Sequence, residues 1–175
     1  RDALGDYGGA SQMSTFTASN MDKHATDVAA LAGKRLVTAS ETEKGRRWAE
    51  ERIKELTGGD KVQARFMRRD NFEFMPQCKL VFMGNSAPAL SNADEAMRRR
   101  IRIIPFVNPP QHRDPALAKR LEKEHAGILG WALEGLASYL AGGFTTPAEV
   151  IHATDSYMSD QDLIGQWIEA KCKTE

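Results

Sequence analysis

Short apolar stretches separated by polar turns dominate the first 110 residues of the chain. Three of them, Arg35–Ala39, Leu80–Met83 and Ile101–Phe106, have the length and aliphatic content of buried strands. The stretch Lys61–Met75 instead alternates apolar and polar residues around the polar turn Arg68–Asn71, which predicts a β-hairpin. Strands interleaved with helical segments indicate an α/β fold.

Helical patterns occupy most of the remaining chain. The chain start reads as the end of a helix that runs into a glycine-rich turn at Gly8. Trp131 and Trp167 lie on amphipathic stretches, so we expect both to be core residues. Further helices are predicted over residues 22–31, 45–56, 114–141 and 147–171. In the second of these, Trp48, Ile53 and Leu56 form the inward face.

Size and charge limit the classes of function. The chain has 175 residues, of which 41% are hydrophobic, enough for one well-buried core. We therefore expect a core over residues 1–110 and a helical C-terminal part over 111–175. Lysine plus arginine and aspartate plus glutamate both number 24, so overall charge does not favour polyanion binding, and any contact with nucleic acid must come from local clusters.

Cysteine and histidine spacing indicates no metal centre. Cys78 and Cys172 lie far apart, which argues against a disulfide scaffold or a cysteine zinc site and favours a reducing, cytoplasmic location. No apolar run approaches the ~20 residues that cross a bilayer, and no signal-peptide pattern opens the chain. We expect no metal ligands among the four histidines, His24, His112, His125 and His152, and treat them as structural.

The most informative polar residues follow the predicted strands. Asn85 comes directly after Leu80–Met83, and the run Arg98–Arg100 precedes Ile101–Phe106. An amide can orient a water or a phosphate, and a guanidinium can stabilise a phosphoryl group during transfer. On an extended chain the three arginines cannot all point the same way, so at least one is expected to face a partner. The alternatives are a turn-forming Asn85 and a solvated arginine face.

Glu41 and the hairpin each have two interpretations. Glu41 follows the strand Arg35–Ala39, at the strand end where open α/β sheets bind ligands, and could polarise an attacking water. Otherwise it is an ordinary exposed carboxylate. The hairpin tip either contacts phosphates through its cations or carries charge for solubility. We expect its aromatic residues, Phe66, Phe72 and Phe74, to be core anchors.

A phosphate loop of the form G-x-x-x-x-G-K-[ST] is missing from the sequence. Its only Gly-Lys pair, Gly33-Lys34, is followed by Arg35 and lacks the earlier glycine.

An ordered series of motifs resembles the phage/plasmid primase-helicase family, which belongs to the superfamily 3 helicases, a branch of the AAA+ ring ATPases. The resemblance covers nearly the whole chain. It rests on Leu31–Val37, Glu41, Ile53–Asp60, Phe74–Pro76, Lys79-Leu80, Gly84–Pro88, Arg99-Arg100, Ile104–Phe106 and Gly127–Ala132. It implies an AAA+-like P-loop NTPase core that lacks its first strand and phosphate loop, with a pore β-hairpin and a C-terminal helical extension.

The resemblance also assigns roles to single residues. Glu41 matches the Walker B acid, although Ser40 stands where many relatives have a second acidic residue. Asn85 matches sensor 1. Arg99 best matches the arginine finger that reaches into a neighbouring subunit, with Arg100 next to it. The candidate contacts to single-stranded DNA are the cations of the hairpin segment, Lys61, Arg65, Arg68 and Arg69.

The implied function is that of a DNA helicase and ATP hydrolase in phage or plasmid replication. It uses ATP and Mg²⁺ and forms a ring, expected to be hexameric, around single-stranded DNA. The phosphate loop is expected a helix upstream of Arg1, so the chain by itself should hydrolyse ATP poorly or not at all. Relatives often carry a DNA primase domain further upstream. An alternative is a nucleotide switch or scaffold that binds nucleic acid or protein without unwinding, and a weaker one is a transcriptional regulator that reads DNA with the hairpin.

Overall fold

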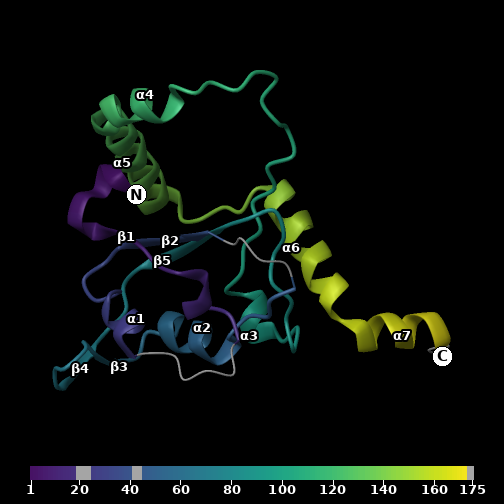
Figure 1. The fold of residues 1–175 in the computed structure, drawn as a ribbon. Helices are drawn as coiled ribbons and strands as arrows, with labels where there is room; N and C mark the ends of the chain where they lie inside the picture. Colours follow the sequence, from purple (N-terminus) through teal and green to yellow (C-terminus); the bar gives the residue numbers. More distant parts are fainter. Residues whose placement is uncertain (19–24, 41–44, 173–175) are drawn as a thin grey trace.

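The computed structural model describes residues 1–18, 25–40 and 45–172 (Figure 1). It contains a parallel sheet, a separate hairpin and a helical C-terminal part. In chain order the elements are η1 Asp2–Tyr7, β1 Gly8–Ala10, η2 Met13–Thr15, α1 Ala25–Ala29, β2 Leu36–Ser40, α2 Glu50–Thr57, β3 Val62–Arg65, β4 Asn71–Phe74, β5 Lys79–Met83, α3 Glu95–Arg98, α4 Leu117–Lys123, α5 His125–Gly142, α6 Ala148–Gln161 and α7 Leu163–Lys171.

Three parallel strands in the order β1-β2-β5 form the central sheet. The β2–β5 register runs from Leu36 opposite Lys79 to Ser40 opposite Met83. The predicted α/β fold is confirmed, as are the strands predicted at Arg35–Ala39 and Leu80–Met83, which correspond to β2 and β5. Strand β1 was not predicted, because Gly-Gly-Ala offers no apolar signal and pairs with β2 only through its backbone.

The core lies against one face of this sheet. Val37 and Ala39 of β2 are almost fully buried there, next to Leu80 and Phe82 of β5. The Phe82 ring meets the rings of Phe16 and Trp48 at centroid distances of 5.0 and 4.8 Å. Such edge-on and tilted contacts place positive ring edges against negative ring faces. The three aromatic rings therefore join β5 to two earlier segments, one between β1 and β2 and one directly before α2.

Helix α2 begins at Glu50, so the prediction that this helix starts at Gly45 is wrong. Arg47 forms an isolated bridge to Ala89, and Trp48 forms another to Thr17. The backbone of this segment is thus paired with two loops and cannot also be helical. The predicted inward face is still correct, since Trp48, Ile53 and Leu56 are all buried.

The predicted strand Ile101–Phe106 is also wrong. The Ile103 N–H donates to Thr154 Oγ1 of α6 at 3.0 Å instead of to a strand. Pro105 has no N–H to donate to a ladder, and the Phe106 side chain is 96% exposed. The three arginines before this segment lie at the end of a short helix and in the turn after it, not on an extended chain.

The N-terminal part differs from the sequence prediction in detail. The residues before Gly8 form the 3-10 turn η1 and not the end of an α-helix. Of the helix predicted over 22–31, α1 covers 25–29, and Asp22 to His24 lie outside the described residues.

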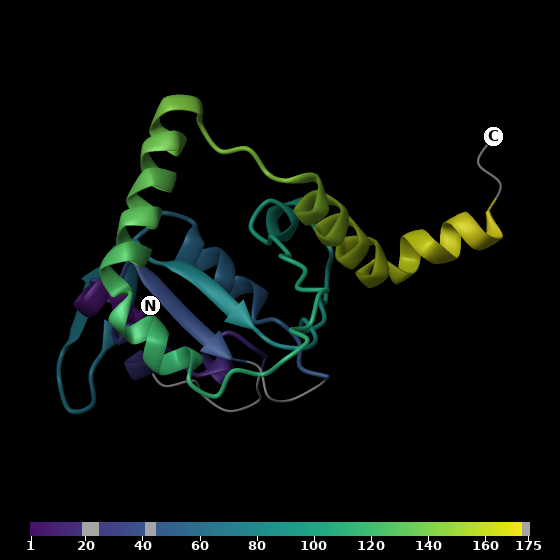
Figure 2. The same ribbon diagram turned by 90° about the horizontal axis from the view of Figure 1, so that it is seen from above.

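Helices make up the C-terminal part, but they are broken where single long helices were predicted. Helix α4 ends before Glu124 and α5 follows, while α6 and α7 meet at Asp162, whose side chain caps α7 by accepting from the Gly165 N–H at 2.9 Å. Helix α7 projects away from the sheet (Figures 1 and 2). No helix in the described ranges is long and apolar enough to span a bilayer.

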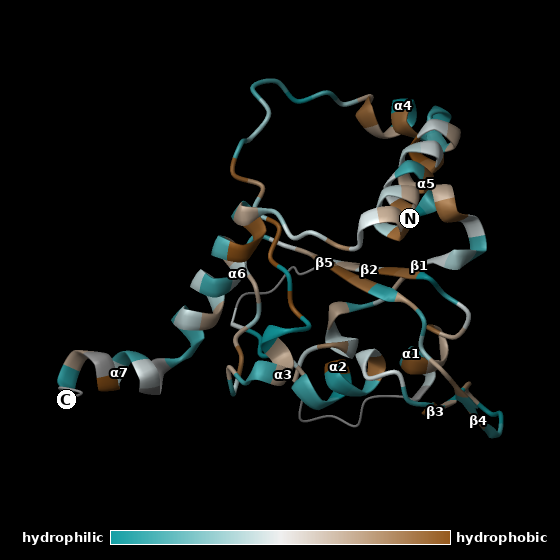
Figure 3. Cartoon of the chain, turned by 180° about the vertical axis from the view of Figure 1, so that it is seen from behind, coloured by the Kyte–Doolittle hydropathy of each residue, from teal (hydrophilic) through white to brown (hydrophobic). Residues whose placement is uncertain are grey.

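The two C-terminal tryptophans were expected in the core, and this prediction is wrong. Trp131 on α5 is 75% exposed and Trp167 on α7 is 60% exposed. Helix α5 exposes hydrophobic side chains along its length, among them Leu133, Leu136 and Leu140, and hydrophobic (brown) stretches recur along its ribbon in Figure 3. Its apolar pattern therefore does not mark a single buried face.

Candidate functional site

Asn85 lies in the loop that leaves the carboxyl end of β5. Its side chain is exposed and has no hydrogen-bond partner among the described residues. The register pairs Ser40, the last residue of β2, with Met83, so the two strands end at the same edge of the sheet. Glu41, the residue after Ser40, lies outside the described residues. The structure thus provides a free amide at the carboxyl edge of a parallel sheet, the edge at which open α/β sheets generally bind ligands.

Helix α3, which precedes the arginine run, is fixed at its first residue. Asp94 is the N-cap, and its carboxylate accepts from the Met97 N–H at 2.8 Å. The same carboxylate accepts from Lys54 Nζ of α2 at 2.8 Å. The hydrogen bond from Lys54, followed by that from Met97, lowers the pKa of Asp94, and the reciprocal bond raises the pKa of Lys54. Helix α3 is therefore anchored to α2 by a charged pair.

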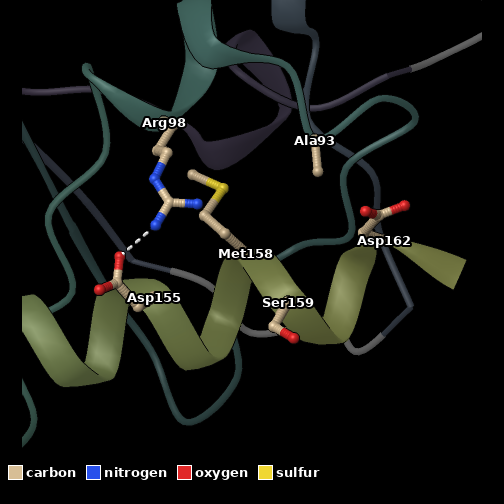
Figure 4. Close-up of a pocket in the computed structure, with 6 residues that line it drawn as sticks. All are labelled: Ala93, Arg98, Asp155, Met158, Ser159 and Asp162. Carbon is tan, nitrogen blue, oxygen red and sulfur yellow. Dashed lines mark hydrogen bonds and ion pairs between the residues drawn. The ribbon is translucent and has the colours of Figure 1, made fainter. Parts of the chain in front are cut away.

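Two of the three arginines have partners within the chain. Arg98 Nη2 donates to Asp155 Oδ1 of α6 at 2.6 Å (Figure 4). Arg100 Nε donates to Thr57 Oγ1 at 3.0 Å, and its Nη1 donates to the Ala96 carbonyl at 2.7 Å. Both guanidinium groups are thereby turned toward the body of the molecule.

Arg99 differs from both neighbours. It is the C-cap of α3, its side chain is exposed, and no described residue accepts a hydrogen bond from it. The expectation that the arginines would point in different directions is confirmed, although a helix end and not an extended strand separates them. Arg99 is the one whose guanidinium is free for a group outside the described chain.

A shallow pocket of about 350 Å³ lies between α3 and α6 (Figure 4). The Arg98–Asp155 ion pair forms part of its wall, and the buried Met158 forms its apolar part. Ala93, Ser159 and Asp162 complete the lining.

The predicted hairpin is present and its two faces are distinct. Strands β3 and β4 pair antiparallel, with Val62 opposite Phe74 and Arg65 opposite Asn71. Val62 and Ala64 are buried, and Phe72 and Phe74 pack against the core, so the expectation that these two rings are anchors is confirmed.

The cations lie on the other face of the hairpin and at its tip. Arg65, Arg68 and Arg69 are exposed, and none has a side-chain partner among the described residues. Lys61 forms a long ion pair with Glu73 at 3.9 Å. Arg68 has a φ of 59°, the left-handed conformation that closes the turn. Three free guanidinium groups therefore lie at the exposed end of the hairpin, one on the last residue of β3 and two in the turn.

Phe66 only partly fits the anchor prediction. Its ring stacks on Phe72 with a centroid distance of 5.5 Å and an interplanar angle of 16°, yet its side chain is 40% exposed. An exposed aromatic next to free arginines is typical of surfaces that bind single-stranded nucleic acid.

The candidate residues form two separate groups. The hairpin joins the amino end of β5, whereas Asn85 follows its carboxyl end, and Figure 2 shows the hairpin on the side away from the arrowheads of the sheet. The five residues of β5 alone span roughly 16 Å. The hairpin cations therefore do not share one site with Asn85 and the α3 arginines.

Sequence reasoning missed the residues that hold these groups in place. Asp94 had a readable signal, because an aspartate three residues before the amide it caps is a standard helix start. Tyr157 had none. Its hydroxyl donates to the Pro88 carbonyl at 2.5 Å and accepts from Trp48 Nε1 at 3.0 Å, and these partners lie 69 and 109 residues away in the sequence.

The described fold defines an α/β protein whose parallel sheet carries a hairpin inserted directly before one strand. The chain belongs to the family described as "Family of unknown function (DUF5906)", whose model matches residues 3–100. That range contains both groups of candidate residues and ends at Arg100, so α4 to α7 lie beyond it.

Two viral proteins are similar to the chain. It is 26% identical over 139 residues to "Putative helicase L207/L206" of Acanthamoeba polyphaga mimivirus, an alignment that covers 66% of this chain and 14% of the viral protein. It is 28% identical over 136 residues to "Putative helicase 022R" of Frog virus 3 (isolate Goorha), covering 67% and 14%. The chain thus spans about a seventh of the length of these relatives.

The Lys54–Asp94 pair predicts a specific acid sensitivity. Because the folded-state pKa of Asp94 is below its ordinary value of 3.8, the pair stabilises the fold above that pH, and this contribution is lost as the pH falls through the lowered pKa. Asp94→Asn keeps a capping side chain but removes the charge. We expect urea midpoints of the variant to fall less than those of the wild type between pH 6 and pH 3. Equal losses would contradict a role for the charged pair.

Proposed function

We propose that the chain is part of the ATPase core of a replicative DNA helicase of the phage/plasmid primase-helicase type, within the AAA+ superfamily 3 helicases. In the complete protein this core would assemble into a hexameric ring and couple ATP hydrolysis to translocation on single-stranded DNA. The similarity to two viral proteins with helicase names supports the class.

The observation that carries the proposal is the combination of a free Asn85 at the carboxyl edge of the sheet with a free Arg99 at the C-cap of α3. In a ring, Asn85 would orient the attacking water or the terminal phosphate within its own subunit. Arg99 would stabilise the negative charge that develops in the site of the neighbouring subunit. Since Arg98 and Arg100 are bound within the chain, Arg99 is the best candidate for this role.

The described residues supply only one side of a nucleotide site. They contain no group of three histidine, cysteine, aspartate or glutamate residues that could hold a metal ion, and the sequence has no phosphate loop. In the proposal, the phosphate loop and the main ligands of Mg²⁺ come from residues upstream of Arg1, and Glu41 adds the acid of the β2 strand end. Bound Mg²⁺ would neutralise phosphate charge.

The hairpin would contact DNA in the pore of the ring. Its free guanidinium groups at Arg65, Arg68 and Arg69 suit phosphate oxygens, and Lys61 has only a weak competitor in Glu73. The hairpin joins the amino end of β5, and Asn85 follows its carboxyl end. This separation would let nucleotide and DNA bind the same subunit without competing for space.

Arg99→Ala tests the proposed ATPase. In a longer form of the protein that includes the upstream phosphate loop, we expect the variant to lose about 10³-fold in DNA-stimulated phosphate release, the scale of an arginine-finger deletion. The control is Arg120→Ala, which removes an exposed arginine of α4 paired with Asp114.

Unchanged turnover of Arg99→Ala would contradict the assignment of the finger. Absence of turnover in the longer wild-type protein, together with DNA binding, would favour the nucleotide switch or scaffold instead.

Neutralising the hairpin tip tests the proposed DNA contact. Arg68→Gln with Arg69→Gln should weaken binding to single-stranded oligonucleotides about equally for all sequences. The slope of log K against log salt should shrink by about 1.4, because each lost phosphate contact removes about 0.7 on single strands. Fluorescence anisotropy at several salt concentrations measures this, with Arg120→Ala as the control. A loss confined to particular sequences would indicate a reader of bases and not a pore hairpin.

A further inference from the structure

One face of α6 is turned toward the body of the molecule. It consists of Thr154, Asp155, Tyr157, Met158 and Gln161, whose spacing places them on adjacent turns of one side of a helix. Thr154 and Met158 are 5% and 2% exposed. Asp155 and Met158 face Arg98 in Figure 4. This inward face of α6 meets two segments that precede it by 50 residues or more, the loop after β5 and the segment around α3.

The first contact holds the loop that carries Asn85. The Tyr157 hydroxyl donates to the Pro88 carbonyl at 2.5 Å, and the Leu90 N–H donates to Gln161 Oε1 at 3.0 Å. Pro88 and Leu90 are buried. Pro88 is three residues from Asn85, so the loop has little freedom between the end of β5 and its attachment to α6.

The second contact holds the segment that carries Arg99. Asp155 accepts from Arg98 at 2.6 Å, and Thr154 Oγ1 accepts from the Ile103 N–H at 3.0 Å. These two bonds lie on either side of Arg99 in the sequence. The ion pair is half exposed and contributes little by itself, so the bond to the buried Thr154 matters more.

Trp48 connects α6 to the sheet itself. Its indole N–H donates to the Tyr157 hydroxyl at 3.0 Å, while its ring packs against Phe82 of β5. Burial raises the pKa of Tyr157 to about 12, so the hydroxyl keeps its proton, and with it the bond to Pro88, well above neutral pH. Removing the hydroxyl would leave the N–H of the buried Trp48 without its acceptor.

We propose that α6 is a positioning element that fixes the Asn85 loop and the Arg99 segment relative to each other, with Tyr157 as its central positioning residue. The role in catalysis rests on the proposed ATPase function, whereas the mechanical coupling does not. Helix α6 lies beyond the part of the chain that the family model matches. It thus adds to the matched part of the fold a connection between the water-orienting amide and the arginine that serves the neighbouring site.

Amide hydrogen exchange of the 175-residue chain, resolved by residue with NMR, tests the coupling. In Tyr157→Phe we expect exchange about tenfold faster at the Leu90 amide and also at the Ile103 amide, the cost of one net hydrogen bond. Tyr157 touches neither amide directly, so a joint effect requires α6 to act as a unit. Tyr139→Phe, on the exposed side of α5, removes the same atom without a bonded partner and should change neither amide.

A second variant separates coupling from local loss. Gln161→Ala removes the acceptor of the Leu90 N–H, and we expect it to speed exchange at Ile103 as well. Combined with Tyr157→Phe, its effect should be less than additive, because both changes release the same helix. Faster exchange at Leu90 alone, or simple additivity, would overturn the proposal.

Kinetics of the longer, phosphate-loop-containing protein test the link to catalysis. Tyr157→Phe should lower kcat roughly 3- to 10-fold with an unchanged KM for ATP, because it misplaces Asn85 and Arg99 without touching the bound nucleotide. An unchanged kcat together with faster exchange would overturn the positioning role. If the wild-type protein has no turnover, the proposed ATPase function fails, and the exchange experiment still decides whether α6 couples the two segments.

Discussion

The parallel pairing of β2 with β5 is the constraint on which the rest of the structure depends. Its five-residue register turns Val37 and Ala39 toward the same side as Leu80 and Phe82 and so creates the apolar face of the core. The same register brings Ser40 and Met83 to one edge. A slip by one residue would turn the core side chains to the opposite face and displace the loop that begins at Gly84.

The aromatic contacts extend this constraint to the rest of the molecule. Phe82 projects from β5 between Phe16 and Trp48, and Trp48 in turn bonds to Tyr157 of α6. A path of packed rings and one hydroxyl therefore links the sheet to the C-terminal helices. The loop that carries Asn85 and the segment that carries Arg99 are both bonded to α6 at the end of this path, which is why a helix far along the chain can hold them.

Features that depend on local sequence could be predicted. Alternation of apolar and polar residues around a polar turn predicted the hairpin. Short apolar runs predicted β2 and β5. The failures have non-local causes. Ile101–Phe106 has a strand-like composition, but it pairs with no strand in the described part of the chain, and the Ile103 N–H donates to Thr154 instead. The segment around Trp48 is helix-compatible in sequence, yet its backbone hydrogen bonds to Phe16, Ala18 and Ala89 override that preference.

The candidate site shows the same division. Asn85 could be placed at a strand end from its position in the sequence alone. The sequence alone could not predict which arginine is free. The side-chain partner of Arg98 lies 57 residues away and that of Arg100 lies 43 residues away. The exposure of Trp131 could not be predicted either, because an apolar helical pattern does not indicate whether another element packs against that helix.

The central claim is that Arg99 acts on a nucleotide bound to a neighbouring subunit, and complementation in the longer protein tests it most directly. Glu41→Gln and Arg99→Ala variants should each be inactive alone. When equal amounts are mixed and reassembled, about a quarter of the interfaces would combine an intact Glu41 with an intact Arg99 from the next subunit. The account predicts that DNA-stimulated ATP hydrolysis reappears in the mixture. A mixture of reassembled rings that stays as inactive as its components would contradict it.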